Sequence, residues 1–399
     1  MSLDLSRERG IPLEKQTFTW KDLVRQPYSK LDVDAFTRVR VILMNGIESG
    51  QLRFLHVMAQ RNESLREPLA RVRRTEQHQQ TLVNWLHPAD QTLLETTLGY
   101  EQVAIELTAD IAQKEPDAYL AQTHRFGLLE DFDHLYRYAA LYDRLEGGDA
   151  NNITQSYTDL RPSRPTEVHH RHPLDDLRRP YDPRTAHPLS KLHAYILTSA
   201  EYQTHDYYMH VGPLFSDPAA RRTYAEIASV EEQHVTMYES LIPEAESWLE
   251  MWMLHEATEV YTYWSCYGQE SDPRIKQIWE RMLQYELGHL HLVRQLFEKT
   301  EGRDASEVLP NELPEPIAWT EHRQFVRETL KKEIDLRANG PEYVSRDQEP
   351  KRSLEYRAQM NREGVPAMAV SEGWVWTPGT ELAPKARELN QNREERRLQ

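Results

Sequence analysis

Apolar residues recur at spacings of three and four over eight long segments of the chain, the pattern of amphipathic helices. Proline or glycine interrupts this pattern between segments, as expected where one helix ends and the next begins. The predicted helices cover residues 34–61, 64–86, 90–113, 117–145, 189–212, 217–241, 244–268 and 273–300. The pattern therefore predicts an all-α protein with two groups of four helices.

The remaining stretches lack this periodicity. Residues 149–188 are rich in proline and contain His169, His170 and His172, so we interpret them as a solvated linker or arm. One further helix is expected at about 320–338, and an apolar island at Val370–Trp376 is expected to dock on the helices. The predicted domains are a four-helix bundle (1–148), the linker (149–188), a second bundle (189–303), and a C-terminal helix with an extended tail (304–399).

The two groups of helices repeat one another at a nearly constant spacing. Four matches carry the repeat: Glu48 with Glu201, TEQH at 75–78 with EEQH at 231–234, Glu101 with Glu256, and His134 with His289, at 153, 156, 155 and 155 residues. A period of this length indicates a duplicated domain rather than a short structural repeat. We therefore expect two tandem bundles that pack as an internal pseudo-dimer.

Two Glu-x-x-His motifs lie on alternate helices of the second group. Residues i and i+3 share one face of a helix, so each motif offers an oxygen and a nitrogen ligand to the same point. Single glutamates occupy the other two helices, and the four glutamates follow one another at intervals of 30, 25 and 30 residues. One dinuclear metal site is predicted, with the ligands Glu201, Glu231, His234, Glu256, Glu286 and His289.

This alternation resembles the ligand pattern of the ferritin-like di-iron carboxylate superfamily, which includes rubrerythrins, ferritins and dioxygen-activating di-iron oxidases and oxygenases. The resemblance covers the helices of 189–300 and, more loosely, those of 34–147. It implies a cofactor of two iron ions, with manganese or a mixed Mn/Fe pair as alternatives. One feature departs from the pattern: many such bundles have a long crossover between the second and third helices, but only 22 residues separate His234 from Glu256.

The first group carries an imperfect version of the motif. The matching residues are Glu48, His78, Glu101 and His134, while Thr75 and Asp131 stand at the positions of Glu231 and Glu286. Glu76 and Glu130 are adjacent carboxylates that offer substitutes. We expect a degenerate site kept as a packing partner; a mononuclear or differently tuned centre is the alternative.

Other candidate residues have simpler explanations. The motif Glu167-x-x-His170 lies in the linker and is expected to arise by chance, because Glu and His are abundant. His205 is an outer partner of the site, a seventh ligand or a surface residue, and His255 and His291 are expected to be peripheral. The aromatic residues of the second group are expected to fill its core, with some lining a substrate pocket as the alternative: Tyr202, Tyr208, Tyr238, Trp252, Tyr263, Trp264 and Tyr285.

Composition excludes several classes of protein. Lys and Arg total 48 against 64 Asp and Glu, a net charge of −16, which argues against a nucleic-acid partner. The sequence lacks both an apolar run of about 18 residues and a secretory signal, so we expect a cytoplasmic protein without a membrane partner. The single cysteine, Cys266, excludes an internal disulfide, a four-cysteine zinc site and a rubredoxin centre, and is expected to pack as an apolar residue.

Three functions fit these features. The first is a di-iron oxidase or oxygenase that uses dioxygen or peroxide to oxidise a small organic substrate, although no catalytic residue is assigned. The second is a rubrerythrin-like peroxidase, which requires an external electron donor because the chain lacks the cysteines of a rubredoxin. The third is a non-catalytic iron-binding or scaffold protein. The aromatic second bundle and the covering linker and tail favour the first, and a homodimer is left open.

Overall fold

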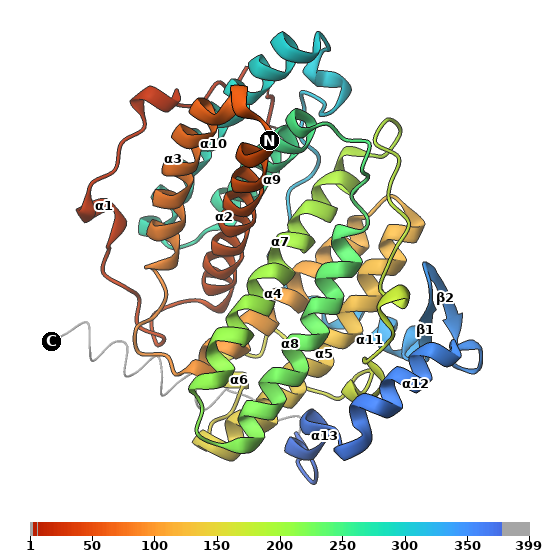
Figure 1. Ribbon diagram of the computed structural model, residues 1–399. Coiled ribbons are helices and arrows are strands. Elements are labelled where there is room, and N and C mark those ends of the chain that lie inside the picture. The colour runs from red at the N-terminus through yellow and green to blue at the C-terminus, as the bar shows by residue number, and fades with distance from the viewer. Residues whose placement is uncertain (1–2, 6, 377–399) are drawn as a thin grey trace, which may run out of the picture.

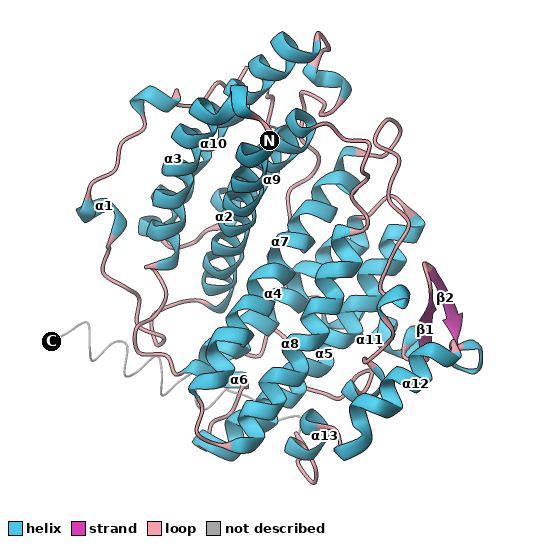
Figure 2. Ribbon diagram, in the orientation of Figure 1, coloured by secondary structure: helices cyan, strands magenta, loops and turns pink. Residues whose placement is uncertain are grey.

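Eight long helices account for most of the computed structural model, which describes residues 3–5 and 7–376 (Figures 1 and 2). They are α2 (Ala35–Arg61), α3 (Arg66–Asn84), α4 (Leu93–Lys114), α5 (Ala118–Glu146), α7 (Pro188–Val211), α8 (Pro218–Glu239), α9 (Trp248–Gln269) and α10 (Pro273–Glu301). Each coincides with a predicted segment to within a few residues. The predominantly helical class is therefore confirmed.

The ends of these helices are fixed by side chains that recur in both halves of the chain. Three kinds of end are repeated 155 residues apart: capping boxes (Thr92–Glu95 and Ser247–Glu250), aspartate N-caps (Asp117 and Asp272) and C-terminal glycines with positive φ (Gly147 and Gly302). Each supplies a hydrogen bond, or a left-handed backbone conformation, that a helix end requires. The prolines and glycines of the sequence therefore indicated the helix boundaries correctly.

The helices form two groups that lie side by side in Figure 1. Along the chain, the helices of one group stand before and after those of the other, and the names outer and inner refer to this order. The outer group consists of α2, α3, α9 and α10, and the inner group of α4, α5, α7 and α8. Sequential helices pair as hairpins in both groups; α2 also packs on α9, and α4 on α7. Each group thus takes one hairpin from 1–148 and one from 189–303, the segments predicted as separate bundles.

Two glycines of α2 join the groups. A Cβ at Gly46 would lie 2.7 Å from the amide nitrogen of Gln203 on α7, and one at Gly50 would overlap Ser199. Any larger side chain at these positions would hold the two helices apart. As a result α2 packs against both α9 of its own group and α7 of the inner group.

The segment between α5 and α7, here called the crossover arm (residues 147–187), is not a solvated linker. It includes the short helix α6 (Asn151–Thr154), and His169, His170 and Arg171 are all at most 4% exposed. The Arg171 guanidinium donates to both oxygens of Glu130 on α5, at 2.7 and 2.9 Å. Ionic pairing of this kind allows a charged, proline-rich segment to be buried.

The C-terminal region packs on the inner group. Helix α11 (Arg323–Glu333) is shorter than predicted and is followed by an antiparallel hairpin of β1 (Leu336–Asn339) and β2 (Glu342–Ser345), with Leu336 opposite Ser345. The helices α12 (Lys351–Met360) and α13 (Pro366–Val370) come next. The hairpin and these two helices were not predicted, because their segments are too short and too polar for a clear periodicity.

The apolar island expected at Val370–Trp376 does dock. Val370 is buried in the same hydrophobic cluster as Val326 and the inner helices. The Trp374 ring lies 4.9 Å from that of Tyr136, and its Nε1 donates to Asp143 at 3.0 Å. The rest of the predicted tail, 377–399, lies outside the described residues. Within the described residues, none of the helices combines the length and the apolar character needed to cross a membrane.

Near the N-terminus, the short helix α1 (Trp20–Leu23) follows an extended segment that lies along α10. Gly10 adopts φ +60° there, and the backbone N–H of Ile11 donates to the Gln284 carbonyl at 2.7 Å. A Cβ on Gly288 of α10 would collide with the Ile11 carbonyl. This close approach brings the N-terminal segment beside the Glu-x-x-His motif of α10.

Candidate metal centres

The six ligands predicted for one site lie in two separate clusters. Glu201, Glu231 and His234 belong to an inner cluster, together with Glu101, Asp131 and His134; Glu256, Glu286 and His289 belong to an outer cluster, together with Glu48, Glu76 and Glu259. The structure therefore does not bring the six residues predicted for a single centre in 189–303 together at one point. Regular spacing places residues at similar heights along a bundle, but it does not determine which helices are neighbours.

The inner cluster consists of two overlapping sets of ligand atoms. One set comes from Asp131, Glu201, Glu231 and His234 and the other from Glu101, His134 and Glu231, and within each set all ligand atoms lie within 4.8 Å of one another. The shared residue is Glu231. Its two oxygens face different imidazoles, with Oε1 3.0 Å from His134 Nδ1 and Oε2 3.2 Å from His234 Nδ1. A carboxylate between two histidines is positioned to bridge two metal ions.

The carboxylates of the inner cluster are buried without an arginine or lysine partner. Glu101, Asp131, Glu201 and Glu231 are at most 2% exposed, and in the described structure their ion pairs are with His134 and His234 only. Burial raises the pKa of Glu101, Asp131 and Glu201. Burial also opposes ionisation of Glu231, but the hydrogen bonds and charges of the two histidines outweigh it and lower the pKa of Glu231 to about 2. A cation between these groups would remove the cost of burying them.

In both histidines of the inner cluster, the ring nitrogen that faces away from the cluster has a hydrogen-bond partner. His234 Nε2 lies 2.9 Å from Glu130, whose pKa the nearby Arg171 guanidinium keeps well below its usual range despite burial. An ionised carboxylate accepts a hydrogen bond, so Nε2 carries the proton and Nδ1 faces the cluster. This is the arrangement in which a histidine binds metal through one nitrogen and is oriented through the other.

His134 is oriented by the crossover arm. Its Nε2 lies 3.3 Å from His169 Nδ1, and His169 Nε2 lies 2.7 Å from the Arg164 carbonyl. Burial lowers the pKa of His169 well below its ordinary value, so the ring is neutral and its one proton is on the nitrogen facing the carbonyl. His169 Nδ1 therefore accepts from His134, which leaves His134 Nδ1 as the ligand atom.

The outer cluster follows the same plan with more carboxylates. One set of ligand atoms comes from Glu76, Glu256, Glu286 and His289, and the other from Glu48, Glu76 and Glu259, again within 4.8 Å. The shared residue is Glu76, which precedes Glu231 by 155 positions. All six residues are fully buried, and in the described structure no arginine or lysine forms an ion pair with them.

Charge is more concentrated in the outer cluster than in the inner one. Burial, reinforced by repulsion from neighbouring carboxylates, raises the pKa of Glu48, Glu76, Glu256 and Glu259 well above its ordinary value. The two oxygens of Glu259 and one each of Glu48, Glu76 and Glu256 accept no hydrogen bond. These groups require either protons or cations, and polyvalent cations satisfy several carboxylates at once.

The outer histidine is also supported from behind. His289 Nδ1 lies 2.8 Å from Glu76 and 3.2 Å from Glu286, while its Nε2 lies 2.7 Å from Gln16 Oε1. The Gln16 amide nitrogen donates to the carbonyls of Ile11 and Tyr285, which fixes the orientation of the amide. Nε2 of His289 therefore donates, and Nδ1 is directed at the carboxylates.

The predicted alignment of the first Glu-x-x-His motif was shifted by one residue. Glu76 and Gln79 match Glu231 and His234 at the constant spacing of 155, whereas Thr75 and His78 do not enter the cluster. His78 is half-buried beside the ring of Phe18, with 5.5 Å between ring centroids. Gln79 takes the place of a histidine and donates to Glu76 at 3.1 Å, to Glu48 at 3.4 Å and to Glu286.

Some of the other candidate residues hydrogen bond to the clusters, and the rest lie outside them. Three of the aromatic residues hydrogen bond to cluster carboxylates: Tyr208 to Glu101, Trp252 to Glu256, and Tyr263 to Glu48. His205 pairs with Asp206, His291 contacts Arg9, and His255 stacks on Phe54, all outside the clusters. Cys266 is buried in the hydrophobic core, and His170 pairs with Glu226 rather than Glu167.

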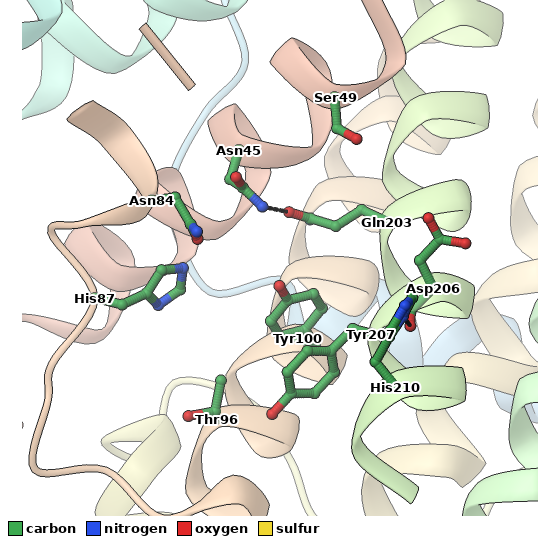
Figure 3. Close-up of a pocket in the computed structure, with 10 residues that line it drawn as sticks. All are labelled: Asn45, Ser49, Asn84, His87, Thr96, Tyr100, Gln203, Asp206, Tyr207 and His210. Atoms are coloured by element: carbon green, nitrogen blue, oxygen red, sulfur yellow. Dashed lines mark hydrogen bonds between the residues drawn. The ribbon is translucent and has the colours of Figure 1, made fainter. Parts of the chain in front are cut away.

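An open pocket of about 470 Å³ lies where the two groups meet (Figure 3). Asn45 of α2 and Gln203 of α7 bond across it, and the stacked rings of Tyr100 and Tyr207 form one wall. Its lining includes residues of α4 and α7, the helices that carry Glu101 and Glu201, but none of the inner-cluster residues themselves.

No family model, curated protein or solved structure matches this chain. Its function must therefore be argued from the two clusters themselves.

Proposed function

We propose that the inner cluster binds a pair of metal ions, iron with manganese as the alternative, and that the protein is a dinuclear-metal oxidoreductase. One observation carries the proposal: Glu101, Asp131-x-x-His134, Glu201 and Glu231-x-x-His234 converge from four helices, with Glu231 between the two histidines. Four carboxylates and two histidines in this order are the ligand pattern of ferritin-like di-iron carboxylate proteins.

The connection between the helices supports the same assignment. A ferritin-like bundle has one long crossover between its second and third helices. In the inner group the order is α4, α5, crossover arm, α7 and α8, so the arm of residues 147–187 is that crossover. Because α8 and α9 belong to different groups, the short connection between them does not have to serve as a crossover within one bundle. The outer group repeats four inner-cluster positions at a spacing of 155 residues, and Glu48 and Glu201 are 153 residues apart, so we take it as the second copy of a duplicated bundle. The four pairs are Glu76 with Glu231, Glu101 with Glu256, Asp131 with Glu286 and His134 with His289.

The residues present fit such a metal pair. Glu101 and His134 would hold one ion, Asp131, Glu201 and His234 the other, and Glu231 would bridge them. A pair of this kind, once bound, supplies electrons to dioxygen or peroxide. The chain excludes water by burying all six ligands, and Glu130 and His169 hold the histidine protons away from the metal-facing atoms.

The outer cluster is proposed as a second centre with different selectivity. It offers five carboxylates and one imidazole, and oxygen-rich sets favour harder ions such as Mn²⁺ more than imidazole-rich sets do. The protein would then carry a complete iron site and a carboxylate-rich partner site. The absence of arginine and lysine pairs from both clusters, within the described residues, weighs against the alternative of a helical scaffold.

The proposed substrate site is the pocket shown in Figure 3. The pocket between the groups has polar walls from Asn45 and Gln203 and an aromatic wall from Tyr100 and Tyr207, which suits a small organic molecule with a polar group. A peroxidase with an external electron donor is the second candidate. The two differ in whether an organic compound is consumed with dioxygen.

The experiment is anaerobic reconstitution of the full chain with Fe(II), followed by metal analysis, Mössbauer spectroscopy and measurement of dioxygen uptake with a reductant. We expect a magnetically coupled iron pair and uptake that both disappear in His134→Ala and His234→Ala. His170→Gln is the matched control, because it removes a buried histidine that contacts neither cluster. Uncoupled iron, or iron binding unchanged in the first two variants, would refute the proposal.

A further inference from the structure

A third group of metal-ligand side chains lies apart from both clusters. Glu115 ends α4, His124 is in the second turn of α5, and His193 is in the second turn of α7. Their ligand atoms lie within 4.8 Å of one another, and their side chains are at most 1% exposed. The three residues thus join the turn of one inner hairpin to the start of the other.

One oxygen of Glu115 faces both histidines. Glu115 Oε2 lies 2.7 Å from His193 Nδ1 and 3.5 Å from His124 Nε2. The other oxygen, Oε1, accepts from the Asp117 backbone N–H at 2.9 Å and from the Ser190 hydroxyl. The carboxylate is therefore held in place by groups that do not belong to the cluster, as metal-binding carboxylates commonly are.

The protein does not satisfy the hydrogen-bonding groups of the His124 ring. It is fully buried, and neither of its ring nitrogens has a hydrogen-bond partner. A buried polar group left in this state costs roughly 1–3 kcal/mol. Burial also lowers the pKa of His124, so the ring does not balance Glu115 by carrying a positive charge.

His322 shows how this chain satisfies a buried histidine that serves as an ion-pair partner. Its Nδ1 lies 3.0 Å from Glu106 and its Nε2 3.5 Å from Asp110, and the pKa of His322 is raised to about 9. Burial lowers that pKa, but the two carboxylates outweigh the effect. Each ring nitrogen of His322 thus faces a carboxylate, whereas His124 faces one only through Nε2, 3.5 Å from Glu115, and its Nδ1 faces none.

We propose that Glu115, His124 and His193 bind a single divalent transition-metal ion of the zinc or ferrous iron class. Two imidazoles and one carboxylate are a recurrent ligand set for these ions. The ion gives His124 a partner for its lone pair and relieves the crowding of two imidazoles on one carboxylate oxygen. Its position ties the α4–α5 turn to α7, so it stabilises the inner group across the crossover arm. The site stands independently of the proposed dinuclear centre.

The test is metal analysis of the full chain after saturation with Zn²⁺ and removal of unbound metal. His124→Gln and His193→Gln are each expected to lose about one equivalent of zinc per chain and to melt at a lower temperature in its presence. His322→Gln is the matched control, because it removes a buried histidine between carboxylates and is expected to keep the full zinc content. Circular dichroism verifies that each variant is folded.

A second measurement locates the ion. Anomalous diffraction from zinc-loaded crystals should show a peak about 2.0–2.1 Å from both histidine nitrogens. Equal zinc contents in all variants, or no anomalous peak at the three residues, would overturn the proposal. Failure of the dinuclear centre gives a different result: the zinc lost in His124→Gln would be unchanged, while His134→Ala and His234→Ala would lose none.

Discussion

His169 Nδ1 accepts a hydrogen bond from His134 Nε2 over 3.3 Å, and this contact sets which nitrogen of His134 faces the inner cluster. Gln16 has the same relationship to His289 in the outer cluster, at 2.7 Å. One support comes from the crossover arm and the other from the N-terminal segment. In both groups, therefore, a segment outside the helices orients a histidine between them.

Removal of the first support should weaken the inner cluster selectively. In His169→Ala, the His134 ring loses its fixed tautomer and orientation, and we expect Fe(II) affinity to fall by roughly 10- to 100-fold. Competition with a metal-binding dye measures the change. His170→Gln serves as the neighbouring control, and an affinity equal to that of the unmodified chain would contradict the role assigned to His169.

The substitution Gln79→His should give the outer cluster a second imidazole ligand, at the position that corresponds to His234. Gln79 is fully buried and already directs its amide at three carboxylates, so an imidazole of similar length would face the same point. We expect zinc and ferrous iron to bind about tenfold more tightly there, because imidazole favours these ions. Isothermal titration in a Glu231→Ala, His124→Gln background isolates the outer cluster from the inner cluster and from the site at Glu115. Weaker binding in the variant would show that the amide is required.

Gly288→Ala should disturb the outer cluster through the N-terminal segment. The added methyl group would collide with the Ile11 carbonyl, which positions Gln16 behind His289. We expect a loss of about 1–3 kcal/mol in the free energy of unfolding, and weaker metal retention in the outer cluster alone.

Gly268→Ala is the control for this substitution, since a Cβ at this exposed helical position meets open space. It should leave metal content unchanged and raise stability by about 0.5–1 kcal/mol. Denaturant unfolding followed by circular dichroism compares the two. Equal stabilities would mean that the N-terminal segment does not pack on α10 in solution.

Stability should fall as pH rises through the titration of His322. Its pKa is raised from 6.5 to about 9 by Glu106 and Asp110 against the effect of burial, so its stabilising contribution is complete below about 6.5 and is lost as pH passes about 9. The change should appear in denaturant midpoints measured from pH 6 to 10. His322→Gln should flatten this part of the profile, and parallel profiles for the two proteins would refute the ion pair.

The helices were predictable because their signals are local. Capping residues, glycines and apolar periodicity act within a few positions, so segments such as 273–300 match the observed Pro273–Glu301 closely. The residue types that gather in the two clusters were predictable for the same reason, since the residues of a Glu-x-x-His motif share one helix face. His169 and Gln16 were not found, because their roles depend on contacts made over 35 and 273 residues.

The pairing of helices was not predictable from spacing. Equal intervals along the chain give equal heights, but they do not indicate that α2 packs on α9 and α4 on α7, or that Gly46 and Gly50 bring α2 against α7. The one-residue shift at Glu76 had a signal: Leu69, Val72, Glu76 and Gln79 follow the helical spacing of the buried face. A rotation of one residue turns a helix by about 100°, which moves His78 out of the cluster.

The interleaved order of the two groups determines when each can be completed during synthesis. Every helix of the inner group has been made once Glu239 emerges, whereas α2 and α3 must wait for α10, which ends at Glu301. Domains begin to fold as soon as their partners are available, and distant partners delay closure. We therefore expect the inner group to form first. The earliest helices of the chain, which carry Glu48 and Glu76, are expected to be among the last to complete their packing.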